Sequence, residues 1–363
     1  MKAKLDVINV NEKAGKKQEQ EQMEIRRRQR ERMRAKKLER QRKRRKQLIR
    51  LAVSVVMIVL LVSVIKNMGK KNMTVEVSDR QKQQSTEETE ATYTLAYEVM
   101  YPEFYKHHTP EVLKEKEIDH ALKELAEIYT EFEAIYEEKD KYPDKLLSAL
   151  CNNPEMLSYV EGYLKYESGD KTVAGDAALT SEEKEQRFPL FLQWDKRWGY
   201  EAYGDFNIAL SGCGPTCLSM VLVALNHDYD MTPKKVADFA MKNGFYVEGT
   251  GTAWSLMTEG AKELGLSAKE VSLDEYVMKN QLDAGKMLIC SVGPGDFTAQ
   301  GHFIVIYDYD EHGFRINDPN CVYRSSKSWS YREIASQIKI LWAYGKNGKK
   351  VLEIVSHTDY NRE

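Results

Sequence analysis

One stretch of the chain places two glycines, two cysteines and a proline directly before an apolar run. It reads Leu-Ser-Gly-Cys-Gly-Pro-Thr-Cys over residues 210–217 and is apolar from Val221 to Leu225. The glycines permit a tight turn, and Pro215 suits the first turn of a helix. We therefore expect a buried helix with Cys213 at its N-terminus. Free amides and the helix dipole favour a thiolate there, although most free cysteines are simply small buried apolar residues.

Two β-rich runs further along the chain are joined by a turn that contains glycine. The first run begins at His302, the turn occupies residues 310–313, and the second run ends at Asp318. An antiparallel hairpin brings these two ends together, so we expect His302 and Asp318 to be in contact. A carboxylate so placed orients an imidazole, and Cys213, His302 and Asp318 then predict nucleophile, base and orienting group. Each residue taken alone also has an ordinary structural interpretation.

Four short motifs occur together between about residues 189 and 344. They are Leu-Gln-Trp-Asp-Lys-Arg-Trp-Gly-Tyr at 192–200, Gly-Cys-Gly-Pro-Thr at 212–216, Gly-His-Phe at 301–303 and Asn-Asp-Pro at 317–319. In this order and combination the chain resembles the bacterial C39-like cysteine peptidases. The resemblance implies a papain-like α+β fold, a thiol hydrolase and no cofactor.

The same resemblance implies a glutamine upstream of the cysteine that donates to the oxyanion, and Gln193 is the matching position. The sequence departs from the family here, because bacteriocin-processing members carry this glutamine closer to the cysteine. Asn207 occupies the nearer position in this chain. We therefore expect Gln193 as the oxyanion donor, with Asn207 as its rival.

The other cysteines indicate no metal site. Five cysteines are present, at positions 151, 213, 217, 290 and 321, without a CxxC pair or a His-rich cluster. Cys217 lies one helical turn after Cys213 and is the alternative nucleophile. Its position inside the apolar helix favours a core residue instead.

Charge is distributed unevenly along the chain, although the net charge is only −2. Residues 1–47 are rich in Arg and Lys, and residues 48–66 are apolar apart from Arg50, Lys66 and two serines. The apolar stretch is near the lower length limit of a membrane-spanning helix. The basic excess before it predicts a cytoplasmic N-terminus, with the rest of the chain outside the cell.

Two other interpretations of this region are weaker. Basic runs also bind nucleic acid, but the neighbouring apolar stretch favours anionic lipid headgroups, so we expect a bilayer and no nucleic acid as partner. A cleaved signal peptide has an apolar region of similar length. The long N-terminal arm and the absence of an Ala-x-Ala-like site favour an uncleaved anchor.

The remaining sequence suggests four segments. Residues 67–93 are a polar stalk, 94–167 a helical segment, 168–186 a linker and 187–350 the peptidase domain. In the helical segment Thr109-Pro110 predicts a helix start, followed by an apolar stripe from Ile118 to Ile135. The stripe either pairs with a second copy in a homodimer or packs on the peptidase.

Inside the peptidase domain we expect two helices and a buried strand. The helices are predicted from Thr232-Pro233 to Asn243-Gly244 and from residues 251–254 to residues 264–265, and the strand at 287–292. The glycine-rich loop at 293–297 leads to His302, so the loop and Trp254 are candidate walls of a substrate cleft.

The sequence thus predicts a membrane-anchored cysteine peptidase outside the cytoplasm, acting on peptide or protein substrates. A cell-wall peptide amidase with the same chemistry is the first alternative. A catalytically silent binding or scaffold module is the second.

Overall fold

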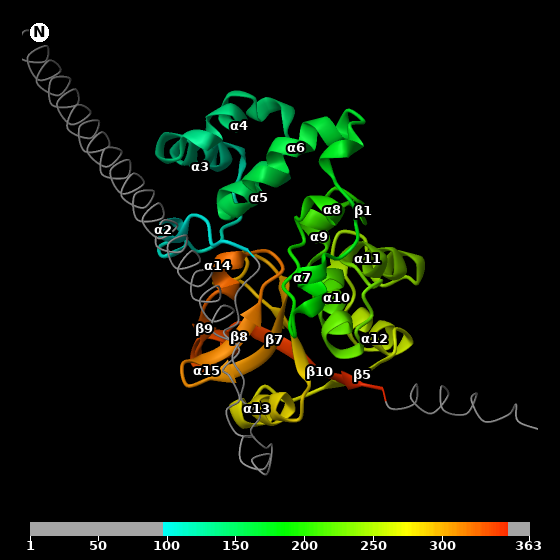
Figure 1. Ribbon diagram of the computed structural model, residues 1–363. Helices are drawn as coiled ribbons and strands as arrows, with labels where there is room; N and C mark the ends of the chain where they lie inside the picture. The colour runs from blue at the N-terminus through cyan, green and yellow to red at the C-terminus, as the bar shows by residue number, and fades with distance from the viewer. Residues whose placement is uncertain (1–96, 348–363) are drawn as a thin grey trace, which may run out of the picture. The chain divides into compact units, whose positions relative to one another are not determined.

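The computed structural model describes residues 97–347 of the chain, all within one compact unit (Figure 1). The predicted basic arm (1–47), anchor (48–66) and stalk (67–93) lie outside these residues and stay predictions. None of the helices within residues 97–347 has the length and apolar character that crossing a bilayer requires.

The first part of the described chain is helical. Its elements are α2 (Pro102–Tyr105), α3 (Glu115–Ile128), η1 (Thr130–Phe132), α4 (Glu133–Glu137), η2 (Lys139–Lys141), α5 (Asp144–Asn152), η3 (Pro154–Met156), α6 (Leu157–Glu167), η4 (Lys171–Val173) and α7 (Ser181–Glu185). The predicted apolar stripe is covered within its own chain, in a core that contains Ile118, Leu122, Leu125, Phe132 and Ile135. Ile128 is exposed.

The predicted helix start at Thr109-Pro110 is wrong. Residues 107–114 contain no helix, and α3 begins at Glu115. The Lys114 N–H donates to the Glu117 carboxylate at 2.8 Å, which satisfies an amide at the true helix start. The stretch before it lies along the cleft described below.

The helical segment packs on the region that follows it. The Tyr159 hydroxyl donates to the Gly199 carbonyl at 3.2 Å, and the Tyr200 hydroxyl donates to the Tyr159 carbonyl at 2.8 Å. Their rings are stacked with centroids 4.4 Å apart. The stretch predicted as a linker also packs on this region, because Glu183 of α7 is buried and forms an ion pair with Arg197 at 2.6 Å.

The second part of the described chain combines helices with a sheet. Its helices are α8 (Lys196–Gly199), α9 (Ile208–Ser211), α10 (Cys213–Asn226), α11 (Pro233–Lys242), η5 (Trp254–Met257), α12 (Glu259–Glu263), α13 (Glu275–Asp283), α14 (Val322–Ser325) and α15 (Tyr331–Ala335). The helix predicted from Thr232-Pro233 is α11. The one predicted over 251–265 starts later, because Gly251 has a φ of +101° and pairs in a strand, and it is divided at Thr258 into η5 and α12.

The central sheet has six antiparallel strands in the order β5-β10-β6-β7-β8-β9. The strands are β5 (Leu266–Glu270), β6 (Met287–Val292), β7 (His302–Asp310), β8 (Gly313–Asn317), β9 (Ser328–Trp329) and β10 (Ile338–Lys346). Two short pairs lie outside it, β1 (Ala202–Tyr203) with β2 (Phe206–Asn207), and β3 (Tyr246–Val247) with β4 (Gly251–Thr252). The strand predicted at 287–292 is β6, and all of its residues are buried.

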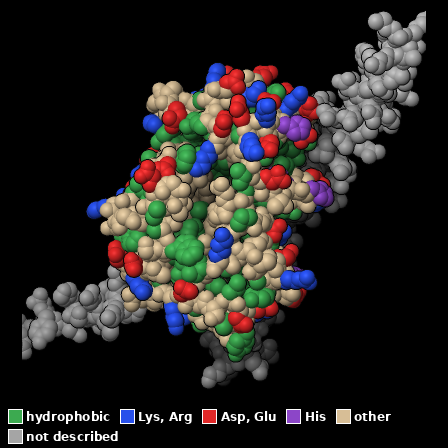
Figure 2. Space-filling model, turned by 180° about the vertical axis from the view of Figure 1, so that it is seen from behind, with side chains coloured by type: hydrophobic (Ala, Val, Ile, Leu, Met, Phe, Trp, Pro, Cys, Tyr) green, Lys and Arg blue, Asp and Glu red, His purple; other side chains and the backbone are tan. Residues whose placement is uncertain are grey.

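The sheet is the middle layer of this region. Phe303 and Val305 of β7 belong to the core shared with α10, whereas Ile304 and Ile306 belong to the core shared with α13 and α15. This alternation is the period of two that a strand buried on both faces requires. The mixture of helices and sheet agrees with the predicted α+β class. On the face shown in Figure 2, charges of both signs are interspersed and hydrophobic side chains gather near the middle.

Candidate active site

Cys213 is the first residue of α10, and glycines hold the chain tightly on both sides of it. A Cβ atom at Gly212 would lie 2.6 Å from the Ile208 carbonyl oxygen, and one at Gly214 would lie 2.7 Å from Thr252 Cγ2. Neither position accepts a side chain without displacing its neighbours. Cys213 itself is half-buried and lines a cleft of about 650 Å³.

Cys217 does not share this environment. It is fully buried one turn further along α10, among the apolar residues of the main core. Burial raises the pKa of its thiol well above the ordinary value. Cys217 is therefore an inert core thiol, as the sequence predicts.

The hairpin of β7 and β8 brings His302 and Asp318 together. Val305 pairs with Asn317 across the two strands, so the start of β7 lies beside the residue that follows β8. His302 Nε2 lies 2.7 Å from Asp318 Oδ1, and both side chains are buried. The predicted contact is confirmed.

The His302 ring lies between a carboxylate and a thiol. Asp318 is an acceptor when ionised, so Nε2 carries a proton toward it. The Cys213 side chain is close enough to the ring to favour its protonated form. Because Nε2 is engaged by Asp318, Nδ1 is the nitrogen left to exchange a proton with the thiol.

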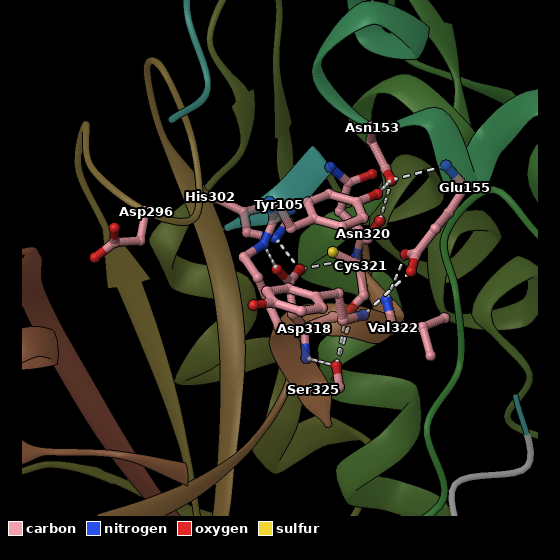
Figure 3. A network of polar contacts seen from close by, with 12 residues as sticks. Tyr105, Asn153, Glu155, Asp296, His302, Asp318, Asn320, Cys321, Val322 and Ser325 are labelled. Carbon is pink, nitrogen blue, oxygen red and sulfur yellow. Dashed lines mark hydrogen bonds and ion pairs between the residues drawn. The ribbon is translucent and has the colours of Figure 1, made fainter. Parts of the chain in front are cut away.

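A buried cation stabilises the Asp318 carboxylate from its other side. Arg324 Nε of α14 donates to Asp318 Oδ2 at 2.5 Å. The Asp318 N–H donates to Ser325 Oγ at 2.9 Å (Figure 3). Burial alone raises the pKa of Asp318, but Arg324 and then His302 outweigh it, and the pKa falls to about 2. Asp318 is therefore an anion at every physiological pH.

The same carboxylate controls His302. Burial lowers the pKa of the imidazole, but the charge and hydrogen bond of Asp318 more than offset this effect. The nearby Cys213 side chain acts in the same direction, and the pKa of His302 rises to about 9. The ring is thus a cation at neutral pH, next to the thiol.

Replacing Arg324 by Met tests this electrostatic arrangement through stability. The change leaves the buried Asp318 with one cation fewer, and we expect a loss of about 3 to 5 kcal/mol in the free energy of unfolding. The carboxylate contributes stability above its unfolded pKa of about 3.9 and loses it as the pH falls through the folded value. Because the variant raises the folded pKa, its acid unfolding should begin at a higher pH. Denaturant unfolding of the full-length chain measures both effects.

Arg315 is the matched control for this variant. Its ion pair with Asp310 is longer, 3.6 Å, and partly exposed. Arg315→Met is expected to cost less than about 1 kcal/mol. Equal losses in the two variants would contradict the role of Arg324.

Gln193 lines the cleft, and its rival does not. Gln193 Nε2 donates to the Ala209 carbonyl at 2.6 Å, and within residues 97–347 no second acceptor contacts this nitrogen. Its Oε1 atom is buried without a hydrogen-bond partner among the described residues. Asn207 instead caps α9 by accepting from the Leu210 N–H at 3.1 Å. It is not a lining residue of the cleft.

The cleft also has walls from the loop before His302 and from the helical segment. Of the loop predicted as a wall, 293–297, only Phe297 lines the cleft, together with residues 298–301 that follow it, and Trp254 is not part of the lining. The helical segment supplies residues 110–115, Ile118 and part of α5. The helical segment is therefore part of the site, which the sequence analysis did not predict.

Two further residues at the site were not predicted. Arg324 occurs in a polar run without any motif, and Glu155 of η3 reaches the loop after Asp318 from the helical segment. Their only sequence signal is a charge in a position that tertiary folding buries. Within residues 97–347 no group of three His, Cys, Asp or Glu side chains is arranged to hold a metal ion.

The similarity of this chain to known proteins lies in the region that carries Cys213 and His302. Residues 185–350 match a family model described as the Peptidase_C39 like family. One similar solved structure is the peptidase domain of Streptococcus ComA, a bi-functional ABC transporter involved in a quorum-sensing pathway. Its sequence is 19% identical to this chain. The aligned region covers 40% of this chain and 98% of the other, with a TM-score of 0.30.

A second similar structure is a C39-like peptidase from Bacillus anthracis. Its sequence is 16% identical to this chain. The aligned region covers 44% of this chain and 94% of the other, with a TM-score of 0.29. No curated protein matches the chain. The part of the chain that carries Cys213, His302 and Asp318 is thus similar in sequence to C39-like peptidases.

Proposed function

We propose that this protein is a cysteine peptidase that hydrolyses peptide or amide bonds through Cys213, His302 and Asp318. The observation that carries the proposal is the buried His302–Asp318 pair, 2.7 Å apart, whose imidazole lines the same cleft as the Cys213 thiol at the N-terminus of α10. A thiol and a base that line one cleft, with a buried carboxylate that orients the base, are the parts that acyl transfer needs. The match of residues 185–350 to a peptidase family supports the same reaction.

The first half of the reaction forms a thioester. The Cys213 sulfur attacks the carbonyl carbon of the substrate while His302 holds the thiol proton. The carbon–nitrogen bond then breaks, and the leaving amine takes that proton from His302. Asp318 stabilises the charged imidazole and fixes its orientation throughout.

The second half releases the acid. His302, now neutral, takes a proton from water, and the water oxygen attacks the thioester carbon. The carbon–sulfur bond breaks, and Cys213 leaves as a thiolate beside the His302 ring that took the proton from water, which restores the starting state. The products are an amine and a carboxylic acid.

Gln193 is suited to hold the charge that develops on the carbonyl oxygen. One of its two amide N–H groups is used on Ala209, which fixes the side chain at the edge of the cleft. The other N–H can donate to the oxyanion, together with the free amides at the start of α10.

The test uses the full-length chain and a diverse peptide library read by mass spectrometry. We expect cleavage that disappears after iodoacetamide has alkylated Cys213. If no peptide is cleaved and Cys213 is not labelled in preference to the other cysteines, the proposal fails. A silent binding module would then be the better description.

We also propose that residues 48–66 anchor the enzyme in a membrane, with residues 187–350 outside the cell. Support comes from the sequence, namely the apolar stretch and the basic excess before it. Protease added to intact cells should therefore digest residues 187–350, whereas residues 1–47 should stay protected. Immunoblotting with one antibody for each part measures this.

Permeabilised cells are the control, because both parts should be digested there. A soluble form that begins after Ile65 would show that the apolar stretch is a cleaved signal. Complete protection of residues 187–350 in intact cells would contradict the orientation.

A further inference from the structure

Glu155 connects the helical segment to the chain that carries the catalytic carboxylate. It lies in η3, is 3% exposed, and accepts hydrogen bonds with both carboxylate oxygens. The Val322 N–H donates to Oε2 at 2.8 Å, and the Tyr323 N–H donates to Oε1 at 3.2 Å (Figure 3). These two amides open α14 and have no partner inside that short helix.

α14 in turn determines where Asp318 lies. Its Arg324 donates to Asp318 Oδ2 at 2.5 Å, and its Ser325 hydroxyl accepts from the Asp318 N–H at 2.9 Å. Asp318 Oδ1 then contacts His302 Nε2 at 2.7 Å. A continuous set of hydrogen bonds therefore runs from Glu155 through α14 to the imidazole.

Two neighbours of Glu155 hold the same loop. Asn153 donates to the Asn320 carbonyl, and the Tyr105 hydroxyl donates to Asn153 Oδ1. The Tyr105 ring stacks on Tyr323 with centroids 5.0 Å apart. Three side chains of the helical segment thus converge on residues 320–323, directly after Asp318.

We propose that Glu155 is a positioning residue for the Cys213–His302–Asp318 site, so that the helical segment is a permanent part of the enzyme rather than a removable prodomain. This inference rests on the proposed peptidase function. A carboxylate is suited to the task because it accepts from two N–H groups at once. A neutral carboxyl or an amide of the same shape has only one acceptor oxygen facing them.

This difference makes the positioning sensitive to pH. Burial raises the pKa of Glu155 to about 7, against the opposing effects of the Val322 N–H, Cys321 and Arg324. The other titratable groups that face it do not change charge near neutrality. Burial raises the pKa of Cys321 and of Tyr105 far above neutral, and Arg324 stays charged.

The direction in which turnover changes with pH follows from these groups. Above about pH 7 the carboxylate accepts both N–H groups and holds α14. Below that pH a proton on one oxygen faces an N–H donor, so one of the two bonds is lost. Turnover should therefore decline as the pH falls through 7, at a pH well separated from the values for Asp318 and His302.

The test compares the kcat of wild-type and Glu155→Gln full-length protein across the pH range, on one peptide that the library assay identifies. We expect the variant to be about 10-fold slower above pH 7, the effect of losing one hydrogen bond to a charged group. Its acid decline near pH 7 should be absent. Its melting temperature at pH 8 should not fall, because a buried charge is removed along with the bond. A purely structural role predicts a lower melting temperature and a profile parallel to that of the wild type, and that result would overturn the proposal.

Glu183→Gln is the matched control. Glu183 is also a buried carboxylate that accepts from a backbone N–H, that of Thr180 at 2.8 Å, but it pairs with Arg197 instead of the catalytic loop. This variant should lose stability and keep the wild-type pH profile.

The outcomes separate the two proposals. If the wild-type protein shows no cleavage that depends on Cys213, the peptidase function itself fails. If the wild-type protein cleaves but has no acid decline near pH 7, the role of Glu155 fails alone, and this result decides the matter even if Glu155→Gln does not fold.

Discussion

Replacement of Cys213 by Ala is expected to abolish hydrolysis while the fold is retained. Loss of the nucleophile should lower kcat/KM by about 10⁴-fold or more, because the remaining groups have no atom that forms the thioester. Cys213 is only half-buried, so removal of its sulfur should change the free energy of unfolding by less than about 1 kcal/mol. Peptide cleavage and denaturant unfolding of the same preparation measure the two effects.

Cys217→Ala is the control on the same helix. Its thiol is fully buried, so this variant should lose about 1 kcal/mol of stability but keep its activity. If both variants lost activity to the same degree at normal stability, the assignment of Cys213 as the nucleophile would be contradicted.

Replacement of His302 by Ala is the second large effect that we expect. The imidazole holds the thiol proton, supplies it to the leaving amine and activates water, so kcat should fall by about 10⁴-fold. The Asp318 carboxylate keeps its ion pair with Arg324 at 2.5 Å, which should preserve the surrounding structure. Single-turnover cleavage of the library peptide measures the loss.

His312→Ala is its control on the same hairpin. His312 lies in the turn at the far end, where its side chain is 76% exposed. The variant should retain kcat within about twofold, as surface changes away from a site usually do. Comparable damage from both substitutions would contradict the assignment of His302.

Local patterns explain why part of the site could be predicted from sequence. The two glycines and Pro215 restrict the chain around Cys213 to a turn and a helix start. The alternation in β7 and β8 sets the hairpin register, which brings the start of β7 close to Asp318, and the contacts with α14 complete the placement of that carboxylate. Each inference uses residues close in sequence or paired across one turn.

The parts that were missed depend on contacts between distant segments. Glu155 and Val322 are far apart in sequence, and no periodicity connects a short helix in the first half to α14 in the second. The same holds for Arg324, whose burial follows from how α14 packs. Thr109-Pro110 has the local signals of a helix start, but these residues belong to no helix, and Pro110 lines the cleft instead.

The pH dependence of Cys213 alkylation by iodoacetamide, located by peptide mass mapping, tests the central claim most directly. In the wild-type protein His302 stays a cation until the pH rises through about 9, so Cys213 should react selectively and rapidly at pH 7. In His302→Ala the reaction should be slow at pH 7 and should become faster as the pH rises, because no imidazolium is left to stabilise the thiolate. Superimposable profiles for the two proteins, or alkylation spread evenly over the five cysteines, would contradict the Cys213–His302–Asp318 triad.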